Sequence, residues 1–93
     1  MNERSILALA PNVTVQTLGP DDGGVALRLD TGEMYTLNDT ALDFLQRLDG
    51  AKTIDDVVRE LVGFIDVDQE VLTVDLIEVA DGLAKESLVV VRG

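Results

Sequence analysis

The first third of the chain alternates apolar and polar residues in three short stretches, which cover residues 13–17, 25–29 and 33–37. This period predicts strands that are half buried, since successive side chains of a strand point to opposite faces. In the second stretch Val25, Leu27 and Leu29 share one face. The connections at residues 19–24 and at Thr31-Gly32 are short and contain glycine. Together they predict an antiparallel meander of three strands.

The rest of the chain has helical spacing and predicts three helices: one from Asn38 to about Leu48, one from Thr53 to about Gly63, and one from about Asp68 to Lys85. Asn38 is a favourable N-cap, because its side-chain oxygen can accept an unpaired N–H of the first turn. Thr53 and Asp56 have the spacing of a capping box. Gly50 suits a left-handed position after the first helix. Residues 87–91 predict a short strand or an extended tail.

Length and charge narrow the classes of function. The chain has 93 residues, which predicts a single domain over 1–93, with residues 1–10 as a segment that can be flexible. It carries 18 Asp and Glu against 7 Lys and Arg, a net charge of −11. Such a charge serves solubility or attracts a basic partner, and it repels nucleic-acid phosphates and anionic membrane surfaces. We therefore expect neither nucleic acid nor membrane as a partner.

Cysteine and histidine are both absent, which removes disulfides, thiol nucleophiles, thiolate metal sites and the commonest general base. Enzyme chemistry would depend on carboxylates. Asp55 and Asp56 are adjacent, so on a helix they point to different sides. Residues 66–70 lack the glycine and the spacing of a calcium loop. No apolar stretch approaches the length of a membrane span. We expect a cytoplasmic protein that is not an enzyme and holds no cofactor or metal.

The third predicted helix has more apolar positions than one packed face needs. The expected core stripe consists of Leu72, Leu76, Val79, Ala80 and Leu83. Val74, Ile77 and Ala84 lie beside that stripe, on a shoulder that also includes Thr73 and Asp81. Two interpretations stay open: the shoulder packs on the chain's own sheet or tail, or it is the floor of a groove that a peptide fills.

The third strand, residues 33–37, raises a matching question. An outer strand of a meander has a free edge, and this strand contains neither Pro nor Lys to block pairing. Either it is a short edge strand protected by Glu33, or it is a template for a strand supplied by a partner. An exposed edge would also allow weak pairing with a second copy, so monomer and weak homodimer are both open.

Three segments resemble PqqD-like proteins, also called RiPP recognition elements. Residues 25–38 resemble the family's strand–turn–strand–Leu-Asn signature, and residues 48–57 resemble its "LDG–x–x–T" joint between two helices. The last helix with Leu88-Val89-Val90 resembles its closing element. The resemblance extends from about Pro11 to Val91 and depends on the order and spacing of the pieces.

The resemblance implies an α+β fold with a three-stranded antiparallel sheet packed on a three-helix bundle, similar to a winged helix-turn-helix. It also implies that the chain binds the leader segment of a ribosomally synthesised precursor peptide by strand addition and presents it to a processing enzyme. That enzyme is expected to be a separate leader peptidase similar to cysteine proteases, as in lasso-peptide pathways. An alternative is a peptide chaperone for a radical enzyme in synthesis of a cofactor such as pyrroloquinoline quinone.

The candidate peptide-binding residues are Arg28, Glu33, Met34, Tyr35, Thr36, Leu37, Val74, Asp75, Ile77, Glu78 and Asp81. Tyr35, Val74 and Ile77 are the expected apolar contacts. Asp75, Glu78 and Asp81 are candidates to bind a polar or basic leader group, and Arg28 a carboxylate.

Two other functions share part of this pattern. A winged-helix DNA-binding protein would need a basic recognition helix, and the third helix is acidic. An acyl or peptidyl carrier protein would be equally small and acidic. Such a carrier needs a serine of Asp-Ser-Leu type that opens a helix, whereas Glu86-Ser87-Leu88 follows a helix at the far end of the chain.

Overall fold

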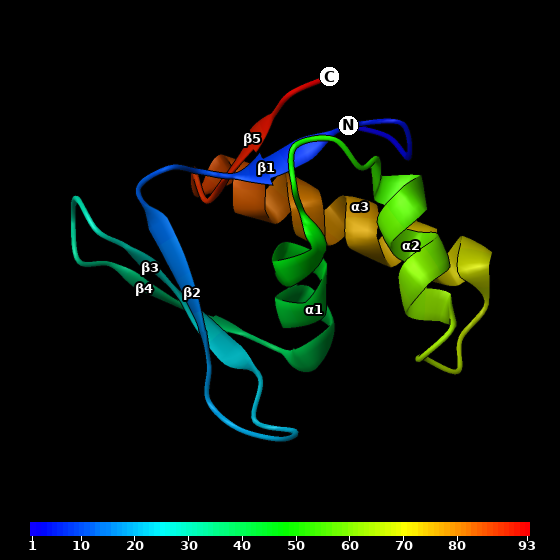
Figure 1. Ribbon diagram of the computed structural model, residues 1–93, viewed down its shortest axis with the longest axis horizontal. Coiled ribbons are helices and arrows are strands. Elements are labelled where there is room, and N and C mark those ends of the chain that lie inside the picture. The colour runs from blue at the N-terminus through cyan, green and yellow to red at the C-terminus, as the bar shows by residue number, and fades with distance from the viewer.

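The computed structural model describes residues 1–93 and contains five strands and three helices. In chain order these are β1 (Leu7–Leu9), β2 (Val13–Thr17), β3 (Gly24–Arg28), β4 (Met34–Leu37), α1 (Asp39–Arg47), α2 (Ile54–Val62), α3 (Gln69–Lys85) and β5 (Val89–Val91). β2, β3 and β4 form an antiparallel sheet in that order, and β1 pairs antiparallel with β5. Figure 1 shows α1 between the three-stranded sheet and α2, with α3 running behind α1. The predicted α+β class, meander and three helices are confirmed.

The helix ends follow the capping residues in the sequence. The Asn38 side chain accepts the Ala41 N–H at 2.8 Å, so α1 begins where predicted. Thr53 and Asp56 exchange both bonds of a capping box, each at 3.0 Å, and fix the start of α2. Gly50 has a φ of +80°, the left-handed conformation expected for it.

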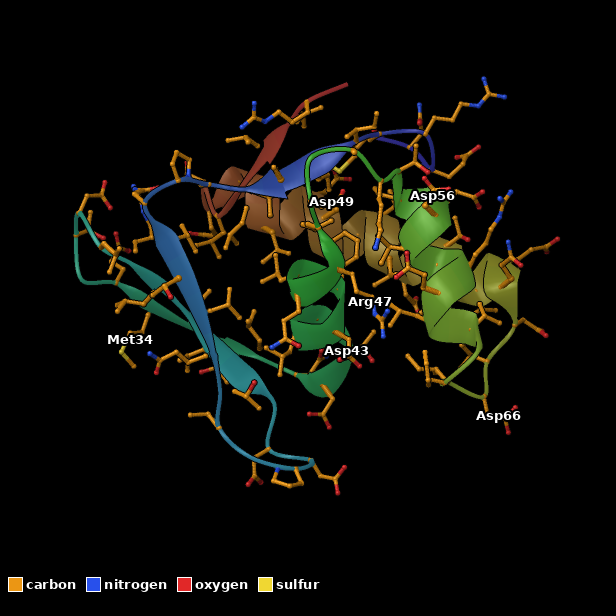
Figure 2. The ribbon with its side chains drawn as sticks, viewed as in Figure 1. Met34, Asp43, Arg47, Asp49, Asp56 and Asp66 are labelled. Carbon is orange, nitrogen blue, oxygen red and sulfur yellow. The ribbon has the colours of Figure 1, made fainter.

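An ion-pair network joins α1 to α2. Arg47 of α1 lies 2.9 Å from Glu60 of α2, and Lys52 lies 2.9 Å from the other oxygen of the same carboxylate. These hydrogen bonds, from Lys52 and then Arg47, lower the pKa of Glu60. Figure 2 shows Arg47 reaching from α1 toward α2. The guanidinium also lies 5.5 Å from the centre of the Phe64 ring, which places the loop after α2 against α1.

The inner face of the sheet differs from the one that the alternation indicates. Ala26 is fully buried against the helices, whereas Leu29 is 64% exposed and belongs, with Val25 and Leu27, to the outer face. The physical reason is the close approach of α1 to β3. A Cβ added at Gly24 would lie 2.8 Å from the Leu42 side chain, so only small residues fit on the inner face at this point.

The N-terminal segment takes part in the fold from Ser5 onward, although the sequence left residues 1–10 as a segment that can be flexible. Leu7 is fully buried in the core, and β1 pairs with β5 through all three of its residues. Backbone bonds also tie this segment to α2, where the Ile54 N–H donates to Ser5, and to the α1–α2 joint, where the Gly50 N–H donates to Leu7. The short apolar run of β1 therefore completes the small sheet with β5 and contributes Leu7 to the core.

One continuous core of 19 buried hydrophobic residues includes side chains from all eight elements. Its largest fully buried members are Phe44, Leu7, Ile54, Leu61 and Leu76. The core holds α1 against the sheet and α3 against α1 and α2, so the relative positions of β4 and α3 are fixed by packing. None of the helices combines the length and the apolar character needed to cross a membrane.

Candidate functional site

β4 is an edge strand whose outward backbone groups have no partner in the sheet. The Arg28 N–H donates to Glu33 and the Leu29 N–H donates to Asn12, so β3 bonds alternately to β4 and β2. Bonded pairs recur at every second residue of an antiparallel ladder, so Tyr35 and Leu37 bond to β3. The N–H and C=O groups of Met34 and Thr36 consequently point away from the sheet and can accept a fourth strand.

A groove lies between the β4 edge and α3. Its first half has a volume of about 400 Å³ and is lined by Tyr35, Thr36, Leu37, Asn38, Ala41, Glu78, Val79, Gly82, Leu83, Glu86 and Leu88. The floor is apolar, because Leu37, Leu83 and Leu88 are core residues with only their edges exposed. Gly82 carries no side chain and leaves this part of the helix surface open.

The groove continues past the start of α1. Its second half, of about 420 Å³, is lined by Asn38, Thr40, Asp75, Glu78 and Val79. Asn38, Glu78 and Val79 belong to both halves, so the two hollows form one continuous depression, which we call the β4–α3 groove. The half beside Tyr35 is largely apolar, and the half beside Asp75 is polar.

The charges around the groove are all negative. Asp75, Glu78 and Glu86 line it from α3, and no Lys or Arg does so. The Tyr35 hydroxyl donates to the Glu33 carboxylate at 3.1 Å on the strand side. Partial burial and then this neighbouring carboxylate raise the pKa of Tyr35. A ligand in the groove therefore meets an apolar floor and an anionic rim.

A sequence profile of a known protein family matches most of the chain. The sequence profile described as "Coenzyme PQQ synthesis protein D (PqqD)" matches residues 23–89. The chain belongs to the PqqD family. The resemblance drawn from the strand–turn–strand signature and the joint between helices is thus confirmed. No curated protein matches the chain in sequence.

Solved structures share this PqqD-like fold. "Lasso peptide synthetase B1 complexed with the leader peptide" is 27% identical with a TM-score of 0.75, over 90% of this chain and 96% of that one. "TbiB1 in Complex with the TbiA(beta) Leader Peptide" is 23% identical with a TM-score of 0.74, over 88% and 93%. The heterocyclase TruD is 18% identical with a TM-score of 0.65, and the likeness covers 94% of this chain but 11% of TruD. At these lower identities the last two show the fold alone.

The PqqD-family fold brings only part of the predicted site together. Tyr35, Thr36, Leu37 and Glu78 all line the groove, and Asp75 lines its polar half. These five residues come from β4 and one flank of α3. Five of the predicted residues therefore lie together in one groove, and their role in peptide binding stays a prediction.

Val74, Ile77 and Asp81 do not share the groove with β4, contrary to the expectation that the shoulder forms its floor. Val74 is 58% exposed and lies in a separate hollow with Glu3 and Asp55, on the α2 side of α3. Ile77 and Asp81 follow it at helical spacing on the same flank. Ile77 packs against the core, so the interpretation in which the shoulder packs on the chain's own elements holds for this residue.

Three further predicted residues lie near β4 but do not line the groove. Met34 is 66% exposed and belongs to the outer face of the sheet, opposite Leu27; Figure 2 shows it pointing away from the helices. Glu33 and Arg28 face each other across the hairpin at 4.0 Å, and Arg28 lies 3.3 Å from Asp30. Partial burial lowers the pKa of Arg28, but ion pairing with these carboxylates outweighs it and raises that pKa. Arg28 thus has acidic partners within its own hairpin.

On the α3 flank that lines the groove, the sequence analysis named Asp75 and Glu78 but did not name Val79, Gly82 or Glu86 as groove residues. Val79 was assigned to the core stripe, but it is only half buried and stands between both halves of the groove. The spacing of Asp75, Val79, Gly82 and Glu86 is the signal that would have identified this flank, because these positions form one helical row interrupted by a glycine.

Proposed function

We propose that this chain captures the leader segment of a ribosomally synthesised precursor peptide as a fourth strand beside β4 and presents it to a processing enzyme. The observation that carries the proposal is the free β4 edge beside a groove that is open along its length. A structure 27% identical to this chain was solved with a leader peptide bound, which supports the same class of ligand here.

Capture would begin with the backbone. Met34 and Thr36 offer two N–H and two C=O groups to an extended peptide, which fixes its register without selecting its sequence. Side chains at every second position of the peptide would then face α3 and enter the groove, where the apolar floor favours apolar residues. Selectivity would therefore come from the groove, and the backbone would supply alignment.

The bound peptide must also reach the enzyme that processes it. The groove is lined by carboxylates, hydroxyl and amide groups and apolar side chains. We propose that it binds peptide without catalysis and that a separate peptidase similar to cysteine proteases removes the leader. A strand held on one side keeps the rest of the precursor free for that enzyme. We place the process in the cytoplasm, where precursor peptides are synthesised.

A second candidate is favoured by the family match itself, since the matched profile describes a protein of coenzyme PQQ synthesis. In that case the same groove would deliver its peptide to a radical enzyme. The enzyme that accelerates peptide processing when this chain is added, a leader peptidase or a radical enzyme, distinguishes the two.

The test is a titration against a synthetic leader peptide from the precursor gene nearest to that of this protein, with two matched proline variants. Thr36 and Thr17 are exposed residues on the two outer strands, and the N–H of each points away from the sheet. Proline in such a position removes an outward N–H and leaves the ladder bonds intact.

We expect wild type to bind at about micromolar strength or tighter, and Thr36→Pro to bind at least about tenfold more weakly. That factor corresponds to about 1.4 kcal/mol, comparable with one lost backbone hydrogen bond plus the steric effect of the ring. Thr17→Pro should bind within about twofold of wild type. Equal affinities of the two proline variants, with both folded by circular dichroism, would exclude strand addition at β4.

A further inference from the structure

Strand addition determines which leader side chains meet α3. Residues that face one another across an antiparallel or parallel pair project on the same face. Tyr35 and Leu37 point toward the helices, whereas Met34 and Thr36 point away. Leader residues beside Tyr35 and Leu37 therefore enter the groove, and these two positions are separated by one residue. The inference below rests on the proposed leader capture.

Tyr35 and Leu37 both line the first half of the groove, but Leu37 lies next to Asn38, where the polar half begins. Beside Tyr35 the groove is closed by Leu83 and Leu88, which offer apolar surface. Beyond Leu37, in the direction of α1, the lining changes to Asn38, Thr40, Asp75 and Glu78. A strand advances about 3.3 Å per residue, so side chains two residues apart are about 6.6 Å apart along the groove. One leader side chain would thus enter the apolar half beside Tyr35, and a long side chain at the next inward position, beside Leu37, would extend into the polar half.

The carboxylates of the polar half have no cation within the protein. Glu60, Asp55 and Asp30 all form ion pairs, but Asp75 and Glu78 form neither an ion pair nor a side-chain hydrogen bond. Four of the seven basic residues, Arg28, Arg47, Lys52 and Arg59, are already paired elsewhere. Two carboxylates one helical turn apart on one flank repel each other, and a cation between them would relieve that repulsion.

We infer that the leader recognised by this chain carries a Lys or Arg two residues from an apolar residue, with the apolar side chain beside Tyr35 and the basic side chain between Asp75 and Glu78. The ligand class is an extended peptide with an apolar–x–basic or basic–x–apolar segment, according to the direction in which it runs. The groove rejects the corresponding acidic segment, because a third carboxylate beside Asp75 and Glu78 would be repelled.

Two charge-neutralising double variants of α3 test the inference. Asp75→Asn with Glu78→Gln removes both groove carboxylates. Glu70→Gln with Asp81→Asn is the matched control, because it removes the same charge from exposed positions on the same helix that do not line the groove. Both are titrated with the fluorescein-labelled synthetic leader at several salt concentrations, beside wild type and Thr36→Pro.

The groove variant should bind about tenfold more weakly than wild type at low salt, and its affinity should depend less steeply on salt, because a screened ion pair has been lost. The control should stay within about twofold of wild type. A leader whose basic residue is replaced by Glu should bind the wild-type protein poorly. The same leader should bind the Glu78→Lys variant more tightly than it binds wild type.

The outcomes separate the inference from the capture on which it rests. If the leader binds wild type, weakens with Thr36→Pro, and binds both double variants equally, the basic-residue requirement is wrong and capture stands. The same holds if a leader that binds contains no Lys or Arg two residues from an apolar residue. If the leader binds wild type no better than Thr36→Pro, strand capture itself fails and the inference fails with it.

Discussion

Truncation of Leu7 to alanine tests whether β1 is part of the core. Leu7 is fully buried and pairs with Val91 of β5 in the small sheet. The change leaves the backbone bonds of β1 in place, because they come from N–H and C=O groups. It removes three carbon atoms from a closed packing and leaves a cavity behind.

The expected loss of unfolding free energy is about 3–5 kcal/mol, the range for leucine truncations in cores that relax only partly. A chain of 93 residues has a total stability of about 5–14 kcal/mol. The cavity left by these three carbon atoms would therefore remove about a fifth of that stability or more. Leu9→Ala is the control, since Leu9 is only partly buried in the same strand; we expect about 1–2 kcal/mol there.

Urea denaturation followed by far-ultraviolet circular dichroism measures both variants. The unfolding midpoint should fall markedly for Leu7→Ala and modestly for Leu9→Ala, with similar slopes. A loss below about 1 kcal/mol for Leu7→Ala would refute the reasoning. It would mean that residues 1–10 behave as the flexible tail that their sequence indicates, and that the core is complete without them.

Two further predictions concern local geometry. Gly23 has a φ of +66°, and an added Cβ would overlap the Leu37 carbonyl, so Gly23→Ala should lose more than ~3 kcal/mol of stability in urea denaturation. Gly32→Ala, with a φ of +77° and nothing within 4 Å, should lose only ~1 kcal/mol; similar losses would contradict the assigned contact. Backbone and side-chain bonds to Thr53 lower the pKa of Asp56, so its stabilisation is present above its unfolded value of about 3.9 and is lost as the pH falls through the folded value. Asp56→Ala should therefore be less stable than wild type at pH 7, and a stability gap that persists unchanged at pH 2 would argue against the capping box.

The helices were predictable because their signals are local. Asn38, Thr53 and Asp56 act on N–H groups within three residues, and the structure shows each of these bonds. The strands of the meander were likewise predictable from their period and from short glycine-containing turns. Interactions between residues a few positions apart in the sequence can be predicted without knowing the tertiary arrangement.

The faces of these elements were harder to predict, because tertiary contacts decide them. The alternation in β3 fits either face, and α1 packs so closely that Gly24 and Ala26 take the inner side while Leu29 is exposed. On α3 Ile77 of the apolar shoulder packs against the core while Val74 is exposed, and the groove occupies the flank with Val79 and Gly82. Helical spacing defines both flanks equally well, and only the position of β4 selects between them.

The small sheet also brings the two ends of the chain together. The Ile6 N–H donates to the Gly93 carbonyl at 3.0 Å, and Figure 1 shows both termini on the side of β1 and β5, away from the β3–β4 hairpin. A domain whose chain enters and leaves at one point can be spliced into a loop of another protein without stretching either structure. In this topology such a fusion would leave the β4 edge open. The same fold can therefore serve as a separate binding protein or as a domain inserted in a longer enzyme.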